Sequence, residues 1–384
     1  MRTGVGFQTQ QLWVGLFFSA LLLMGYSLHQ DYGISWDEPQ QRLIGEVSER
    51  YVLDTLLPFL DWPQRQVPPL HEFRDKDYGV TFELPAVLLE RLLGLSDPQA
   101  IYFLRHWLNF LVFVAGCYAL YRMVAIRSGD WRLGLLAATL LILSPRFFAE
   151  AYYNSKDIVF MAVFAMGMCS LMALIARPGW RVLAVHAFLS ALAVDTRIMA
   201  VLLVAATVAV LLLRALRGEP GWRRMTAFLG GYLLLTSSFM VAMFPYLWAA
   251  PLEHLQAAFQ SMSKFQRWGG DVLYFGRFIN GYELPWHYLP VWIGLTTPLL
   301  ILGLFVAGVL AIARALVQAR FRLYRSPGEL QDLVALGLLV APVTAVIVLG
   351  SVVYNGWRHV YFVYPALLFV AMRGLTALAR AVRS

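Results

Sequence analysis

Long runs of apolar residues, separated by short polar turns, dominate the chain. A helix needs about 20 apolar residues to cross the hydrocarbon core of a bilayer. By this standard the pattern predicts an all-α protein, a polytopic transmembrane helix bundle of ten spans. They cover residues 11–29, 100–124, 132–146, 155–176, 181–195, 198–216, 226–247, 289–313, 332–353 and 358–379. The third and the fifth are short. No small-residue cleavage motif follows the first run, so we expect a retained helix.

Two connections between the apolar runs are much longer than the others, at residues 30–99 and 248–288. Long loops are uncommon unless they carry function or structure of their own. Apolar residues recur at helical spacing over residues 40–57 and 80–94 in the first loop, and a further helix is expected over 251–266 in the second. These segments predict helices that lie along the membrane interface. No separate soluble domain is indicated, so all 384 residues are expected to form one integral-membrane domain.

Composition supports the membrane class. The chain is 59% hydrophobic and 14% charged, whereas a soluble domain is about half apolar and about a quarter charged. The net charge of +8 does not indicate nucleic acid, because the basic residues are spread between the apolar runs and form no single patch. Cys117 and Cys169 both lie inside apolar runs, which favours packing over a disulfide or a metal site.

The arginines predict the orientation. With the N-terminus in the cytoplasm, the short cytoplasmic connections hold almost only basic residues, from Arg2 to Arg383, and most acids fall on the other side. Cytoplasmic loops carry such an excess of Lys and Arg. Both termini are therefore expected in the cytoplasm, and both long loops outside.

An acidic turn, Ser35-Trp36-Asp37-Glu38-Pro39, follows the first apolar run. An apolar transmembrane helix needs no carboxylates where it leaves the membrane. A carboxylate held there against apolar walls is suited to proton abstraction. Asp37 is the candidate base and Glu38 a supporting acid. The alternative is an ordinary pair of acids at the start of the next helix, where negative charge is favourable.

Two further external turns carry charge. Lys156 and Asp157 stand at the mouth of the fourth run, and ionisable residues at membrane depth are usually functional. The alternative is an interfacial pair whose lysine extends toward water. Asp195 and Arg197 separate the fifth and sixth runs. Either Arg197 neutralises Asp195, or it binds an anionic ligand.

A fourth external turn places Arg358 and His359 at the start of the last run. The guanidinium group suits a phosphate because it donates two parallel hydrogen bonds. An aromatic belt with an arginine that extends toward water is the alternative. Together, the four turns predict an outward-facing site for a membrane-soluble anionic substrate.

Three of these motifs resemble the integral-membrane glycosyltransferases of the GT-C fold: Ser35-Trp36-Asp37-Glu38, Asn154-Ser155-Lys156-Asp157 and Trp357-Arg358-His359. The sequence is similar to the group that contains protein mannosyltransferases, aminoarabinose transferases and rhizobial lipopolysaccharide glycosyltransferases, often called family 39-like. The resemblance extends over most of the chain through its topology. Many members carry further spans or a soluble domain after the region that this sequence covers.

The resemblance implies that Asp37 is the catalytic carboxylate, with Glu38 as its neighbour. It implies that Asp157, with the adjacent lysine, orients the substrate or a metal. Arg358 and His359 correspond to basic residues near the polyprenyl phosphate. Donors in this group are polyprenyl-phosphate sugars, which implies a bacterial inner-membrane enzyme with an external active site.

The resulting hypothesis is transfer of a sugar, with inversion, from a polyprenyl-phosphate donor to an acceptor glycan, lipid or protein. Asp37 takes the acceptor proton, and Arg358 with Lys156 or Arg197 stabilises the departing phosphate. A divalent cation stays open as a cofactor, because the sequence shows no defined set of metal ligands. Two alternatives remain: a transporter or flippase for a lipid-linked saccharide, and a non-catalytic subunit of an envelope-polymer assembly.

Overall fold

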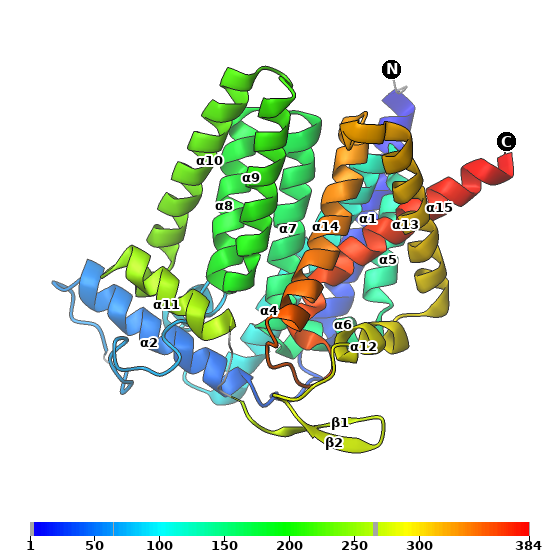
Figure 1. The fold of residues 1–384 in the computed structure, drawn as a ribbon. Coiled ribbons are helices and arrows are strands. Elements are labelled where there is room, and N and C mark those ends of the chain that lie inside the picture. Colours follow the sequence, from blue (N-terminus) through cyan, green and yellow to red (C-terminus); the bar gives the residue numbers. More distant parts are fainter. Residues whose placement is uncertain (1–3, 64, 264–267, 384) are drawn as a thin grey trace.

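The computed structural model describes residues 4–63, 65–263 and 268–383. These residues form a helical bundle with one small β-hairpin (Figure 1). The elements are α1 (Gly4–Leu28), α2 (Glu38–Leu56), α3 (Glu83–Leu92), α4 (Pro98–Ser128), α5 (Trp131–Ile142), α6 (Pro145–Tyr153), α7 (Asp157–Ala176), α8 (Trp180–Thr196), η1 (Ile198–Ala200), α9 (Val201–Leu216), α10 (Trp222–Met243), η2 (Pro245–Leu247), α11 (Pro251–Ser263), β1 (Asp271–Tyr274), β2 (Arg277–Asn280), α12 (Tyr288–Thr296), α13 (Leu299–Ala319), η3 (Arg320–Arg322), α14 (Pro327–Val348), η4 (Arg358–Val363) and α15 (Tyr364–Arg383).

Within the described residues, eight helices are long and apolar enough to cross a membrane. The pair α5 and α6 gives a ninth candidate, bent by 72° at its break. Helix α8 has 17 residues and packs beside α7 and α10. The structure thus has eight candidate spans, or nine with the bent pair, against the ten predicted, and α8 is the predicted span that is too short. The predicted all-α polytopic bundle is confirmed.

Two predicted spans are wrong in detail, both because of prolines. The run 132–146 is not one straight helix: α5 ends at Ile142, and Pro145 opens α6 in a new direction. The run 289–313 is divided by Pro298 into the short α12 and the span α13. Proline lacks the amide hydrogen that would continue a helix and is tolerated in its first turn.

The two long loops lie at one end of the bundle, called the site end below, opposite the end where α1 begins (Figure 1). Helices α2 and α3 confirm the helices predicted in the first loop. Helix α11 covers residues 251–263 of the third predicted helix, and 264–266 lie outside the described residues. The sequence pattern does not predict the antiparallel hairpin β1–β2, whose two turn residues, Phe275 and Gly276, both have positive φ.

Arginines cluster at the other end of the bundle, as predicted from their spacing. Arg127 of α4 donates two hydrogen bonds of 2.7 Å to the buried carboxylate of Asp332 on α14, and Arg373 of α15 donates a third at 3.0 Å. These contacts join three helices. Arg2, a member of the predicted basic set, lies outside the described residues.

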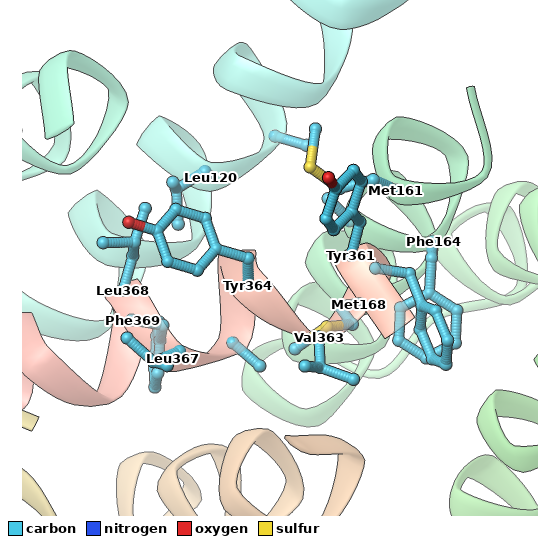
Figure 2. Packing of buried hydrophobic residues seen from close by; sticks show 14 of the residues in the cluster. Leu120, Met161, Phe164, Met168, Tyr361, Val363, Tyr364, Leu367, Leu368 and Phe369 are labelled. Carbon is cyan, nitrogen blue, oxygen red and sulfur yellow. The ribbon is translucent and has the colours of Figure 1, made fainter. Parts of the chain in front are cut away.

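The last helix, α15, packs into the centre of the fold. Figure 2 shows Tyr364 and Leu368 of α15 near Leu120 of α4, and Tyr361 and Val363 of η4 near Met161 and Met168 of α7. Burial of such side chains stabilises a fold by about 1.5–3 kcal/mol each in water. In a bilayer that hydrophobic term is weak between helices, so close packing contributes more of the stability.

Helices α13 and α15 approach closely through two glycines. A Cβ atom at Gly308 would overlap the carbonyl oxygen of Val370, and one at Gly374 would overlap that of Leu304. Small residues at such crossings let two backbones come into contact.

We predict that Gly308→Val separates α13 from α15 and lowers the free energy of unfolding by about 1–3 kcal/mol, the usual cost of overpacking. The melting temperature in detergent measures this. Gly303→Val on the same helix is the matched control, because nothing lies within 4 Å of its Cβ position. Equal melting temperatures for the two variants would contradict the close crossing.

Candidate active site

The four polar turns predicted from the sequence meet at the site end of the bundle. Arg358, at the start of η4, is ion-paired with Asp37 before α2, and its Nε lies 2.9 Å from Oδ2 of Asp157 at the start of α7. Arg197, after α8, is ion-paired with the other oxygen of Asp157. Four segments far apart in the sequence therefore share one charged cluster.

The cluster is mostly shielded from water. The Asp157 side chain is fully buried, while those of Arg197 and Arg358 are 12% and 13% exposed. Lys156 acts electrostatically on the same groups. Two carboxylates then face two guanidinium groups and one ammonium group, which leaves one positive charge in excess. A buried site with an uncompensated cation favours an anionic ligand.

In this cluster, Lys156 is the cation that has no carboxylate paired with it. Its ammonium group lies 4.5 Å from the centre of the Tyr78 ring. Burial is the main cause that lowers the pKa of Lys156 to about 8. The positive charge of Arg197 also lowers this pKa, by more than the negative charge of Asp157 raises it. The side chain is therefore charged at neutral pH and loses its proton near pH 8.

Local hydrogen bonds fix the turn that carries Lys156 and Asp157. The side-chain oxygen of Asn154 accepts the Asp157 amide hydrogen at 2.8 Å, which caps the free N-terminus of α7. Its amide nitrogen donates to Oε2 of Glu150 at 2.6 Å. The Ser155 hydroxyl donates to Oε1 of Glu83 at 2.6 Å. The turn is thus held from α6 and α3.

Glu83 belongs to a buried ion-pair chain that sequence reasoning missed. Arg105 of α4 is 2% exposed and pairs with Glu83 and, at 3.0 Å, with Glu90. Glu90 also accepts from Arg42 of α2 at 2.9 Å. The available signal was a charged Arg105-His106 pair inside a predicted span, where ionisable residues are costly.

The structure decides one alternative that the sequence leaves open. Asp195 does not pair with Arg197; it accepts hydrogen bonds from the Val80 amide at 3.2 Å and the Thr81 hydroxyl at 2.7 Å. Self-neutralisation of that turn is therefore wrong. Asp37 stands at the N-cap position of α2, but its side chain makes no capping hydrogen bond.

Glu38, in contrast, is buried and bonds to the α1–α2 connection and to α4. One carboxylate oxygen accepts the Ser35 amide hydrogen at 2.6 Å, and the other lies 3.0 Å from Nε2 of His106. His359 lies beside the cluster, and its Nδ1 has no hydrogen-bond partner among the described residues.

Two cavities adjoin the charged cluster. One is polar, has a volume of about 500 Å³, and lies between the acidic turn, α6, the hairpin and α12; its lining includes Asp37, Glu38, Glu150, Asn154, Trp292 and Arg358. The other has a volume of about 220 Å³ and is mainly apolar; its lining includes Ile198, Leu202, Val346, Leu349, Arg197 and His359. Lys156 lines both. A polar space and an apolar space therefore meet at a cation.

The charged cluster does not fit a divalent cation. Asp37 and Asp157 are each paired with a guanidinium group. Across the described ranges, no group of three or more His, Cys, Asp or Glu residues could hold a metal ion. Cations within the protein therefore already neutralise the two acids.

Comparisons with known proteins give the fold. No family model matches the sequence, and no curated protein sequence matches it. The structure is similar to the crystal structure of ArnT from Cupriavidus metallidurans bound to undecaprenyl phosphate, with a TM-score of 0.55 and 18% identity. The chain has this protein's fold. The match covers 95% of the chain and 60% of ArnT, so the chain spans about 60% of ArnT's length. The predicted GT-C-like architecture is confirmed.

We predict that Asp157→Ala lowers the free energy of unfolding by about 3–5 kcal/mol, because it leaves Arg197 and Arg358 buried without their shared carboxylate. Asp61→Ala removes an exposed carboxylate and serves as the matched control, with a change within about 0.5 kcal/mol. Melting temperatures in detergent measure both. A stable Asp157→Ala protein would show that the cluster does not depend on this acid.

Proposed function

We propose that the protein is a membrane glycosyltransferase that moves a sugar from a polyprenyl-phosphate donor to an acceptor on the external face of the membrane. The observation that carries this proposal is the position of Lys156, where an apolar cavity adjoins a polar one. The apolar cavity suits a polyprenyl chain, and the polar cavity suits a sugar and an acceptor. The phosphate that joins chain and sugar would lie between them, at the excess positive charge.

The polyprenyl-phosphate donor is also supported by the structural neighbour. ArnT has the same fold and was crystallised with undecaprenyl phosphate. In this chain, Lys156, Arg197 and His359 line the apolar cavity and can donate hydrogen bonds to phosphate oxygens. Charge-assisted hydrogen bonds of this kind are about twice as strong as neutral ones.

The reaction would be a displacement with inversion at the anomeric carbon. The acceptor oxygen or nitrogen forms a bond to that carbon as the bond to the phosphate oxygen breaks. Asp37 takes the acceptor proton, and the phosphate leaves with the bonding electron pair. Asp37 lines the polar cavity with its side chain 36% exposed, and only one of its oxygens is engaged by Arg358. Arg358 and Lys156 stabilise the negative charge that develops on the leaving phosphate.

The opposite end of the bundle supports the external location of this site. Arg127, Arg217 and Arg325 all lie at that end, as the positive-inside rule requires of a cytoplasmic face. We propose that both termini lie in the cytoplasm and that the protein resides in a bacterial inner membrane. The acceptor belongs to the envelope, as a glycan, a lipid or a protein.

A transporter of lipid-linked saccharides is the less favoured function. Such transporters bind their substrates near the bilayer midplane, between broken helices. Here both cavities lie at one end of the bundle, beside the external loops. A non-catalytic subunit would need neither the cavities nor Asp37.

We predict that Asp37→Asn lowers the turnover number at least about 100-fold, the usual contribution of a general base, with little effect on donor affinity. Purified protein supplied with polyprenyl-phosphate sugars and envelope acceptors provides the assay of sugar transfer. Asp31→Asn changes an exposed acid of the same connection and should keep full turnover. Unchanged turnover in Asp37→Asn would remove the proposed base, and lipid movement without sugar transfer would support the transporter.

We predict that donor affinity falls about tenfold between pH 7 and pH 9. Because the pKa of Lys156 is about 8, its ammonium group is mostly charged at pH 7 and mostly neutral at pH 9. A charged hydrogen bond contributes about 1.5–3 kcal/mol. A polyprenyl-phosphate sugar is a suitable probe, because its phosphodiester keeps one charge throughout.

Lys156→Arg tests the origin of this pH dependence, because arginine stays charged across the range. Its affinity should be nearly constant from pH 7 to pH 9. Lys76→Arg, at a half-buried lysine of the first loop away from the charged cluster, should retain the wild-type fall. An equal fall in Lys156→Arg would assign the effect to another group.

A further inference from the structure

The carboxylate of Asp195, in the last turn of α8, fastens the first external loop to the bundle. This residue is 1% exposed. Its Oδ1 accepts the Val80 amide hydrogen at 3.2 Å, and its Oδ2 accepts the Thr81 hydroxyl hydrogen at 2.7 Å. The same hydroxyl lies 3.1 Å from the carbonyl oxygen of Leu192, about one turn earlier in α8. We call these bonds of Val80 and Thr81 to Asp195 the α8 latch.

Gly79 lets the loop backbone lie directly against this end of α8. A Cβ atom at Gly79 would overlap the backbone carbonyl group of Asp195. Val80, the next residue, belongs to the small core of the first loop, and Phe82 belongs to the core of the bundle. The α8 latch therefore stands where the two cores meet.

The latched segment places Tyr78 at the cation of the charged cluster. The Lys156 ammonium group lies 4.5 Å from the centre of the Tyr78 ring. Both residues line the apolar cavity, as does Arg197, which follows Asp195 by two residues. A lysine has a flexible four-carbon stem, and the face of an aromatic ring attracts its charge. The ring thus favours one position of the ammonium group, where the two cavities meet.

We propose that Asp195 is a positioning residue: the α8 latch holds Tyr78 against Lys156 and so keeps the ammonium group where a polyprenyl phosphate binds. The identity of this ligand rests on the proposed function, whereas the latch and its hold on Tyr78 do not. Asp195 is not among the described residues that line the two cavities, so it acts through Tyr78 and not by contact with the ligand.

Three variants test whether Asp195 acts through Tyr78, with undecaprenyl phosphate as the probe of binding to the purified protein. Asp195→Ala removes both acceptors of the latch, and Tyr78→Leu removes the ring but keeps an apolar side chain. We expect each to weaken binding about tenfold, the size of a shielded cation–π contact. Because both changes interrupt the same chain of contacts, the double variant should also lose about tenfold, and not the product of the two losses.

Phe59→Leu is the matched control for Tyr78→Leu. Phe59 is an aromatic residue of the same loop with 77% of its surface exposed, and it lines neither of the two cavities. The control should bind undecaprenyl phosphate as the wild type does.

Asp195→Asn tests whether hydrogen bonds alone form the latch. The amide oxygen can accept from the Val80 amide, and the amide nitrogen can donate to the Thr81 hydroxyl, which then donates to the carbonyl oxygen of Leu192. This variant should recover most of the affinity that Asp195→Ala loses. A loss as large as that of Asp195→Ala would overturn the latch as a set of hydrogen bonds.

Hydrogen exchange of the Val80 amide tests the latch without any ligand. Its protection should fall at least about tenfold in Asp195→Ala, which removes the acceptor of this amide, and should persist in Tyr78→Leu and Phe59→Leu. Intact protection with weaker binding in Tyr78→Leu separates the ring from the latch. If Asp195→Ala does not fold, Thr81→Val removes one of the two bonds and should lower protection and affinity about threefold.

These measurements separate the possible failures. Unchanged Val80 protection in Asp195→Ala overturns the latch. Full affinity in Tyr78→Leu, or multiplied losses in the double variant, overturn the action through Tyr78. Binding without sugar transfer by the wild type removes only the proposed transferase activity. A wild type that does not bind undecaprenyl phosphate removes both the proposed donor and this role of Asp195.

Discussion

The carboxylate of Asp157 lies fully buried between two guanidinium groups, and the arrangement of the site depends on this contact. A buried acid is tolerated only when its charge is compensated and its oxygens are hydrogen-bonded. Arg197 and Arg358 provide that compensation from the ends of α8 and the start of η4. Because both must reach the same acid, the segments that carry them are drawn to the start of α7. The polar and apolar cavities are formed where these segments leave space beside Lys156.

A second set of buried charges attaches the external loops to the bundle. The chain runs from Ser155 through Glu83 and Arg105 to Glu90, and then to Arg42 on α2. It links the turn of Lys156 and Asp157 to two helices that do not cross the membrane. Helices α2 and α3 lie outside the membrane-spanning bundle. They are held by such contacts and by the small core around Val47 and Phe73. Residues of the first loop line both cavities of the site.

Much of the fold could be predicted from the sequence, because spans about 20 residues long leave a clear apolar signal. At Pro145 and Pro298 a helix ends and a new one begins inside an apolar run, which hydropathy alone does not show. The charged turns with Asp37, Asp157, Arg197 and Arg358 were also visible, since ionisable residues stand out between apolar runs. Which of these residues pair with each other could not be predicted. Arg197 is two residues from Asp195 but bonds to Asp157, because tertiary packing determines which acid it reaches. His106 was missed because it lies inside a span, where its partner cannot be inferred from spacing.

Two ion pairs hold η4 and the first half of α15 in place. Arg358 contacts Asp157 at the site end, and Arg373 contacts Asp332, fifteen residues later, toward the opposite end. At about 1.5 Å of rise per residue, these contacts are roughly 20 Å apart along the axis. The helix cannot slide along its axis by one turn without breaking a buried pair at either end. The axial register of Arg358, and with it the position of the positive charge at the site, is therefore set partly by an aspartate on the far side of the membrane bundle.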